Sequence, residues 1–319
     1  MAIQRVYVRL GGGLGDVVQN LLSTEVADIQ EPGYLNIDIP PASVPASSRW
    51  FCRLKDFKKK HPGVCVIAAC MCHNPGAKDL FEYNPLVDEV KMIHWVMPKD
   101  MVDNVFEDAT DAVDINSLFD YKDYEKDSND RIFLSNAEKL PAIAFCQIMP
   151  YIVIHPFAGH KGRELYPLDL YADVIDKLID EYGYRVFVIG KSYKTGVADK
   201  HSHQRDESFS YTRHGLYNVV DRYSAALNIK VIFGASGMIG TYSSMLLSSW
   251  YRKIPSVCMA PPKYGEDFLE YAGTKRPLTF GLLEDYSTVI IIDKDAPPSP
   301  DIVVSELLNV IESNNGGEE

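Results

Sequence analysis

Residues Tyr151 to Gly190 read YIVIHPFAGHKGRELYPLDLYADVIDKLIDEYGYRVFVIG, and this stretch decides the fold. It begins with an apolar, β-branched run, Tyr151 to Ile154, which predicts a buried strand ended by His155-Pro156. From Leu168 onward, apolar residues recur at steps of three and four, the spacing of one helix face. Tyr184 to Ile189 predicts the next strand. Strand, helix and strand in succession predict a βαβ unit, and therefore a parallel sheet.

The loop and the helix ends within this stretch carry further signals. Pro167 lies where the first turn of a helix tolerates proline, and Gly183 lies where a C-terminal cap favours glycine. The loop before the helix carries Lys161 and Arg163, just beyond the carboxyl end of the first strand. Open parallel sheets bind ligands at that edge, so two fixed positive charges lie where a ligand is expected.

The same residues resemble a known family. The stretch from His155 is similar to the start of the C-terminal domain of the heptosyltransferases, glycosyltransferase family nine. That family reads His-Pro-Gly, then a basic residue before Trp-Pro, a helix, and a strand that ends in glycine. This chain has Phe157 in place of that glycine and Tyr166 in place of the tryptophan. The segment NPLVDEVKMIHW, Asn84 to Trp95, resembles the family's turn that leads into a strand and carries no chemistry of its own.

Length, charge and cysteine usage limit the possible classes of protein. The chain has 319 residues, which predicts two domains because a single core rarely grows beyond about 250–300 residues. A net charge of −12 argues against a broad surface for nucleic acid or anionic membrane. The chain shows no signal-peptide pattern and no run of about 18 apolar residues, so we expect a cytoplasmic protein without a membrane span. Its six cysteines, several within strand-like runs, indicate reduced thiols.

The N-terminal half opens with a strand, a glycine-rich loop and a helix. Arg5 to Leu10 predicts the strand, GGGLGD follows at residues 11–16, and Val17 to Val26 has helical spacing. Glycines at such a turn let a ligand approach the backbone, although a tight turn with Asp16 as N-cap is equally consistent. The loop resembles the opening loop of the family, and the resemblance implies that Asp16 is the catalytic base. It also implies an acceptor-side loop formed by Gly12, Gly13, Leu14 and Gly15.

A second family-like stretch, GASGMIGTYSSMLLSSWYRKIPSVCMAPP, covers residues 234–262. We expect Ser243 and Ser244 to cap a helix that begins near Met245, leaving N–H groups for a phosphate. A serine N-cap without any ligand is the alternative. Tyr242 stands where the family has an acidic residue. The resemblance implies donor contacts from Lys161, Arg163, Gly240, Thr241, Tyr242, Ser243 and Ser244.

Three patterns suggest metal ligands and are discounted. CMCH, from Cys70 to His73, lacks the C-x₂-C pairing of a structural zinc site. His201 and His203 lie in a polar stretch typical of a solvated loop. Asp293-Lys294-Asp295 matches the D-x-D of metal–diphosphate sites, but it precedes APPSP and a terminal helix. We therefore expect no metal. Between the histidines and the aspartates of these patterns, Ser224 to Asn228 predicts a short helix and Lys230 to Phe233 a strand.

The two halves together predict the GT-B fold, an α/β architecture of two Rossmann-like domains that face each other across a cleft. The predicted domains are residues 1–150, on the acceptor side, and 151–319, which bind the nucleotide-sugar, with the terminal helix a candidate to pack back on the first domain. The resemblance implies inverting, metal-independent transfer of a sugar from a nucleotide-sugar donor to an acceptor hydroxyl, without a cofactor. Glycans, lipid-linked sugars, proteins and modified nucleobases remain open as acceptors. Two alternatives remain: an inactive nucleotide-sugar-binding module, suggested by Tyr242, and a nucleotide-sugar epimerase of the same fold.

Overall fold

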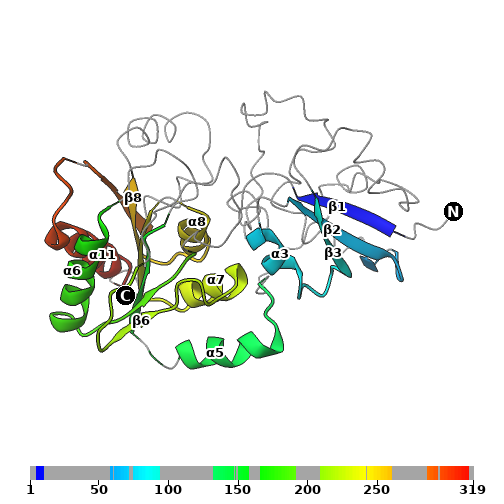
Figure 1. Cartoon of the computed structure of the whole chain (residues 1–319), viewed down its shortest axis with the longest axis horizontal. Coiled ribbons are helices and arrows are strands. Elements are labelled where there is room, and N and C mark those ends of the chain that lie inside the picture. The colour runs from blue at the N-terminus through cyan, green and yellow to red at the C-terminus, as the bar shows by residue number, and fades with distance from the viewer. Residues whose placement is uncertain are drawn as a thin grey trace. The chain divides into compact units, whose positions relative to one another are not determined.

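The fold consists of two compact units, Met1–Ser135 and Asn136–Glu319, each built on a parallel sheet (Figure 1). The division falls before helix α5, Asn136–Cys146, whereas the predicted boundary at residue 150 places that helix in the first domain. No helix among the described residues combines the length and the apolar character needed to cross a membrane. The structure is a computed structural model, and it describes residues 5–10, 58–59, 61–71, 75–93, 132–146, 148, 150–157, 166–191, 209–241, 243–260, 286–293 and 295–315.

The first unit contains a three-stranded parallel sheet in the order β1-β2-β3. Its strands are Arg5–Leu10, Cys65–Met71 and Glu89–Ile93, and the first has the bounds that the sequence predicts. Helix α3, Pro75–Phe81, packs against β2 and β3. Successive residues of β2, from Val66 to Ala68, are fully buried, so both faces of this strand are covered. This explains why the strand is a continuous apolar run in the sequence.

The turn that precedes β3 is held by side chains of the NPLVDEV motif. The Asn84 side-chain oxygen accepts the Leu86 N–H at 2.9 Å. The Asp88 carboxylate accepts the Val66 N–H of β2 at 2.7 Å and contacts the Lys58 ammonium at 2.8 Å. The predicted turn and strand are therefore confirmed, and the motif fixes the entry of β3 against β2.

The second unit contains a six-stranded parallel sheet in the order β6-β5-β4-β7-β8-β9. The chain runs outward from β4 through β5 to β6, returns to β7 beside β4, and then runs outward the other way. The strand order therefore reverses between β4 and β7, and such a reversal places a ligand crevice at the carboxyl ends of the two strands. In chain order, β4 to β9 are Tyr151–His155, Arg185–Val188, Leu216–Asn218, Gly237–Thr241, Ser256–Ala260 and Ser287–Ile291.

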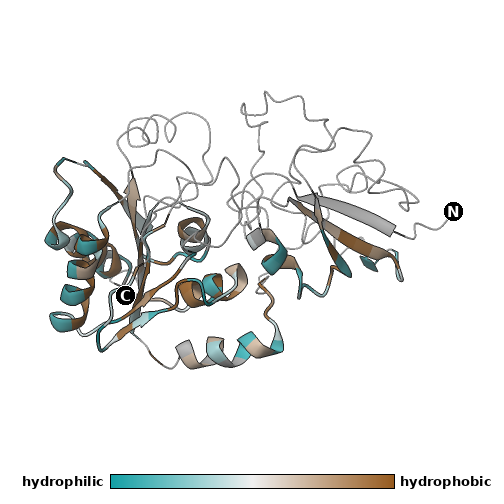
Figure 2. Cartoon of the chain, in the orientation of Figure 1, coloured by the Kyte–Doolittle hydropathy of each residue, from teal (hydrophilic) through white to brown (hydrophobic). Residues whose placement is uncertain are grey.

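Helices cover both faces of this sheet (Figure 1). Helix α6, Leu168–Asp180, packs against α11, Pro300–Asn315, and their apolar residues share one core with Ile152 and Ile154 of β4. On the other face, α7, Ala225–Phe233, packs against α8, Ser244–Tyr251. Tyr151 of β4 reaches this second face, where its hydroxyl donates to the Val231 carbonyl at 2.7 Å. Figure 2 shows hydrophobic residues on the strands and on α7, and hydrophilic residues on α6.

Helix α6 forms as its spacing predicts. It begins at Leu168, and its buried residues come from the predicted apolar face. Gly183 has a φ of +71°, the left-handed conformation that glycine adopts without strain. The Gly183 N–H donates to the Ile179 carbonyl at 3.2 Å and the Tyr184 N–H to the Leu178 carbonyl at 3.0 Å, so backbone bonds around this glycine close the end of the helix. The predicted glycine cap is confirmed. Four residues form the buried face: Tyr171, Val174, Ile175 and Leu178.

One predicted strand is wrong. Lys230 to Phe233 forms the last turn of α7, and the strand that returns to the sheet is β7, Gly237–Thr241. The helix begins after Ser224, whose Oγ accepts the Leu227 N–H at 3.1 Å. Helix α7 lies between the sheet, α5 and α8, and nearly all of its residues are buried. A helix buried on all sides has no polar face, so its apolar run lacks the helical period that distinguishes it from a strand.

Candidate functional site

The structure describes part of the predicted donor site and places it at the carboxyl end of β7. Gly240 and Thr241 end this strand, Ser243 follows, and Ser244 begins α8. These residues therefore lie beside the point where the strand order reverses. The remaining predicted site residues lie outside the described residues, and their roles stay predictions: Gly12, Gly13, Leu14, Gly15, Asp16, Lys161, Arg163 and Tyr242.

Ser243 caps helix α8, as predicted, and the helix starts one residue earlier than expected. Its Oγ accepts the Leu246 N–H at 3.5 Å, and its carbonyl accepts the Leu247 N–H at 3.0 Å. The first N–H groups of a helix have no partner within the helix and carry a partial positive charge, which favours anions. From Met245 to Trp250 the helix is buried, whereas Ser243 and Ser244 are only partly buried. The open part of α8 is therefore the part that can bind an anion.

His155 joins this turn to the neighbouring strand. It is the last residue of β4, stands in register with Gly240 of β7, and is only 7% exposed. Its Nδ1 lies 3.2 Å from the Ser243 Oγ. This hydrogen bond crosses the reversal point of the sheet, from the end of β4 to the cap of α8. The sequence interpretation used His155 only to end a strand, although a histidine directly after a buried strand at a ligand-binding edge is a usable signal.

The imidazole of His155 is enclosed by uncharged groups. Phe157 contacts it edge-on, with the ring centroids 6.0 Å apart. Gly190, after β5, has a φ of +122°, and a Cβ there would lie 3.1 Å from the His155 Nε2 and 2.6 Å from the Phe157 ring. Burial lowers the pKa of His155 from 6.5 to about 4. The ring is therefore neutral near pH 7.

A serine bonded to a histidine is also the arrangement of a nucleophile and its base. Three features of the described residues argue against that interpretation. The pKa of His155 is too low for a general base near neutral pH, which works best with a pKa near 7. The ring contacts that the structure describes, with Ser243, Phe157 and Gly190, include no carboxylate to orient the imidazole. The Ser243 Oγ is already engaged as a helix cap. We interpret the pair as a structural contact.

Thr241 adds an unusual feature to the same edge. It is fully buried, and within the part of the chain that the structure describes its Oγ1 has no hydrogen-bond partner. Buried hydroxyls are almost always paired, because an unpaired one costs about 1–3 kcal/mol. A polar ligand at the carboxyl edge would supply a partner.

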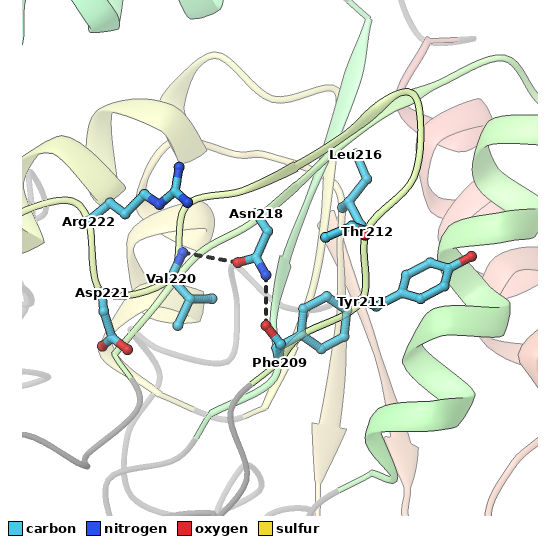
Figure 3. Close-up of a pocket in the computed structure, with 8 residues that line it drawn as sticks. All are labelled: Phe209, Tyr211, Thr212, Leu216, Asn218, Val220, Asp221 and Arg222. Atoms are coloured by element: carbon cyan, nitrogen blue, oxygen red, sulfur yellow. Dashed lines mark hydrogen bonds between the residues drawn. The ribbon is translucent and has the colours of Figure 1, made fainter.

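A cavity of about 360 Å³ lies at the outer end of the sheet, around β6 (Figure 3). Asn218 stands in its wall, donating to the Phe209 carbonyl at 2.7 Å and accepting the Val220 N–H at 3.2 Å. Asp221 has a left-handed φ of +63°, and its N–H donates to the Gly190 carbonyl at 2.9 Å. This bond links the cavity to the edge where His155 lies. The lining residues are Phe209, Tyr211, Thr212, Leu216, Asn218, Val220, Asp221 and Arg222.

The described parts of the discounted metal patterns have structural explanations. Asp293 accepts the Asp295 N–H at 2.9 Å, so its carboxylate closes a local turn. Cys70 is buried, and burial raises the pKa of its thiol to about 12, which disfavours the thiolate that binds metals. The described residues contain no group of three or more His, Cys, Asp or Glu side chains placed to hold a metal ion. Cys72, His73, His201 and His203 lie outside the described residues.

Comparison with known proteins supports the fold. No protein-family model matches the chain, and no curated protein matches it in sequence. The solved structure of Escherichia coli ADP-heptose LPS heptosyltransferase II has a TM-score of 0.53 and 13% identity over 98% of this chain and 99% of its own. A Veillonella parvula glycosyl transferase of family 9 gives a TM-score of 0.53 and 11% identity, covering 98% and 99% of the two chains. The E. coli heptosyltransferase WaaC with ADP has a TM-score of 0.50 and 12% identity, covering 97% of this chain and 99% of its own.

This chain has the heptosyltransferase fold. The predicted GT-B class, with two Rossmann-like units, is thereby confirmed. Because one fold hosts many activities, the reaction has to be argued from the site. In this chain the described site is the turn between β7 and α8 together with His155.

Proposed function

We propose that this protein is a glycosyltransferase that moves a sugar from a nucleotide-sugar donor to an acceptor hydroxyl. The observation that carries the proposal is the Ser243-capped start of α8, which lies where the strand order reverses. Rossmann-like sheets bind the diphosphate of a nucleotide at this point, on the N-terminus of a helix. Support also comes from the heptosyltransferase fold, one of whose solved examples holds ADP.

In this proposal the C-terminal unit binds the donor. The diphosphate lies between the side chains of Lys161 and Arg163 and the start of α8, with Gly240 to Ser244 around it. Two fixed cations and a helix terminus stabilise the charge that develops on the leaving diphosphate, a task that a metal ion performs elsewhere. The mechanism is therefore proposed to be independent of metal. Glycans, lipid-linked sugars, proteins and modified nucleobases are the acceptor classes to be compared.

Asp16 is proposed as the general base. It follows Gly15 at the end of a glycine loop that comes directly after β1, and Gly12 to Gly15 are proposed to border the acceptor. A carboxylate that removes the proton of the attacking hydroxyl assists a single displacement at the sugar carbon, and a single displacement inverts the configuration there.

The first experiment is a thermal-shift series with ADP, UDP, GDP and their sugars, each paired with its nucleoside. A ligand at about 100 times its dissociation constant adds about 2.7 kcal/mol of stability, which such a series detects. Lys161→Ala and Arg163→Ala are expected to weaken binding of the diphosphate by about 1.5–3 kcal/mol each, and to leave the nucleoside nearly unaffected. Failure of every diphosphate and diphospho-sugar to stabilise the wild type would contradict the proposal.

The second experiment separates a catalytic Asp16 from a helix cap. Asn accepts the same backbone N–H groups as Asp but does not remove a proton near neutral pH. Asp16→Asn is therefore expected to keep its melting temperature and donor affinity while sugar transfer falls by about 10²–10⁴-fold. Near-normal transfer by this variant would leave Asp16 a cap and would remove it as the base.

Further outcomes distinguish the rival functions. Binding of a nucleotide-sugar without transfer or hydrolysis would identify an inactive binding module, the reading that Tyr242 suggests. Interconversion of nucleotide-sugars without an acceptor would identify an epimerase. Transfer that EDTA abolishes and Mg²⁺ or Mn²⁺ restores would refute metal independence.

A further inference from the structure

We propose that His155 is the positioning residue of the donor site: its Nδ1 fixes the Ser243 hydroxyl and so holds the first turn of α8 in the orientation that binds a donor phosphate. The inference rests on the proposed function, because it concerns the same site. It gives His155 a role in the site that depends on neither a charge nor a proton transfer.

The argument begins with the two hydrogen bonds at the Ser243 Oγ. As N-cap this oxygen accepts the Leu246 N–H, which leaves its own proton to donate. His155 is neutral because burial lowers its pKa to about 4, and a neutral imidazole has one acceptor nitrogen. The Ser243 hydroxyl therefore donates to Nδ1, and the ring proton is assigned to Nε2. The serine side chain is held from two sides.

The relative lengths of these bonds show which one restrains the turn. The cap bond to Leu246 measures 3.5 Å, the upper limit for a hydrogen bond, whereas the bond between Oγ and Nδ1 measures 3.2 Å. Ser243 and Ser244 are only partly buried, so packing alone restrains them less than the rest of α8. The contact with His155 is thus the shorter of the two hydrogen bonds that restrain the Ser243 side chain.

His155 is itself fixed well enough to act as an anchor. Its backbone belongs to β4, which is paired on both sides, with β5 and with β7. Its ring is closed in by Phe157 and by the backbone of Gly190, where no side chain fits. The position of Nδ1 is therefore set by three adjacent strand ends, and the hydrogen bond transmits that position to α8.

A neutral anchor acts by orientation and not by charge. It aligns the N–H groups of the first helical turn, and these groups bind phosphate oxygens but not a ribose or a base. Loss of the anchor is therefore expected to weaken the binding of a nucleoside diphosphate and to leave the binding of the matching nucleoside unchanged. This selectivity separates positioning from a general loss of structure.

The test uses the full-length protein and the diphosphate among ADP, UDP and GDP that stabilises the wild type most. The side chain of Asn places a polar atom near the position of Nδ1, whereas that of Gln reaches toward Nε2. His155→Asn is expected to keep the dissociation constant within about threefold, while His155→Gln and Ser243→Ala each weaken it by about tenfold. The double variant His155→Gln/Ser243→Ala is expected to bind no more weakly than Ser243→Ala alone, because both changes remove one contact.

Melting temperatures are measured alongside, and Ser243→Ala provides the test if His155→Gln fails to fold. Additive losses in the double variant, equal binding by the Asn and Gln variants, or equal loss for the nucleoside would each overturn the inference. If neither His155→Gln nor Ser243→Ala changes the binding of the diphosphate, the positioning role is refuted and the proposed function stays intact. A wild type that binds none of the diphosphates would refute the proposed function itself and the inference with it.

Discussion

The six-stranded sheet is held differently at the centre of its carboxyl edge and at the start of its outer strand β6. At the centre, His155 and Ser243 share one hydrogen bond, the histidine is buried, and neither side chain carries a charge near pH 7. Beside β6, Arg213 pairs with both Asp176 and Asp180 of α6. These side chains are 22% to 63% exposed, so water and salt reach them.

The two contacts serve different purposes. The outer ion pairs, with the Tyr211 hydroxyl donating to Asp176 at 2.5 Å, tie the segment before β6 to α6. Figure 3 shows Tyr211 extending from the cavity toward that helix. Exposed charges attach a segment at low cost in desolvation but respond to salt. The central contact avoids charge, so it orients its partner at a site where a ligand would bring its own charge. The stability of the central contact should therefore depend mainly on shape and protonation, and that of the outer ion pairs mainly on ionic strength.

The largest effect is expected at Gly190, where shape alone decides. In Gly190→Ala a Cβ would lie 2.6 Å from the Phe157 ring and 3.1 Å from the His155 Nε2, at a φ of +122°. Steric overlap and backbone strain together should lower the free energy of unfolding by about 4 kcal/mol, measured by urea denaturation. Gly183→Ala is the matched control, because its φ is +71° but nothing lies within 4 Å of the new Cβ. Strain alone should cost about 1 kcal/mol there. Equal losses in the two variants would contradict close packing around His155.

The next effect is the response of the central contact to acid. Burial lowers the pKa of His155 from 6.5 to about 4. Between these values the unfolded chain binds a proton that the folded protein does not, so this contribution to stability is complete above pH 6.5 and is lost as the pH falls. The loss should approach about 3 kcal/mol near pH 4.

His155→Asn isolates this titration. The variant and the wild type contain the same carboxylates, whose protonation cancels when their unfolding free energies are compared from pH 7.5 to pH 4.5. As the pH falls across this range, the unfolding free energy of the wild type should decrease relative to that of the variant. Parallel curves would mean that His155 is accessible to protons in the folded state.

The smallest effect is expected at the outer ion pairs. Arg213→Met removes both pairs with α6, and because they are exposed the melting temperature should fall by only about 2 °C. The difference from the wild type should shrink in 1 M NaCl, where the Debye length is about 3 Å. The effect of Gly190→Ala should not change with salt. A salt-independent loss at Arg213 would remove the contrast between the two regions.

The sequence predicted those elements whose pattern is local. The bounds of β1, the buried face of α6, the glycine that ends it and the Ser243 cap depend on neighbouring residues, and all agree with the structure. The overall fold was predicted from short family-like motifs, different ones in each half. Spacing, caps and glycine positions carry this information because each reflects backbone geometry within a few residues.

The parts that the sequence did not predict depend on distant contacts. The sequence predicted a strand from Lys230 to Phe233 because a helix that is buried on every side has the apolar composition of a buried strand. The partnership of His155 with Ser243 joins residues 88 positions apart and follows only from the strand order that sets β4 beside β7. Two predicted roles stay untested, because the described residues include neither side chain: Asp16 as the base, which rests on resemblance, and Lys161 as a donor contact, which rests on resemblance and on its place after a strand end.

Tyr166, which stands in place of the family's tryptophan, affects the order in which the protein folds during its synthesis. Its ring is fully buried, and its hydroxyl donates to the Pro298 carbonyl, 132 positions later and just before α11, at 2.8 Å. At about 5–20 residues per second, a ribosome needs about 7–26 s to add those 132 residues. For most of that interval β4 and α6 have been made, whereas the acceptor of Tyr166 does not yet exist. We therefore expect the chain around Tyr166 to reach its final form only when the last helix docks.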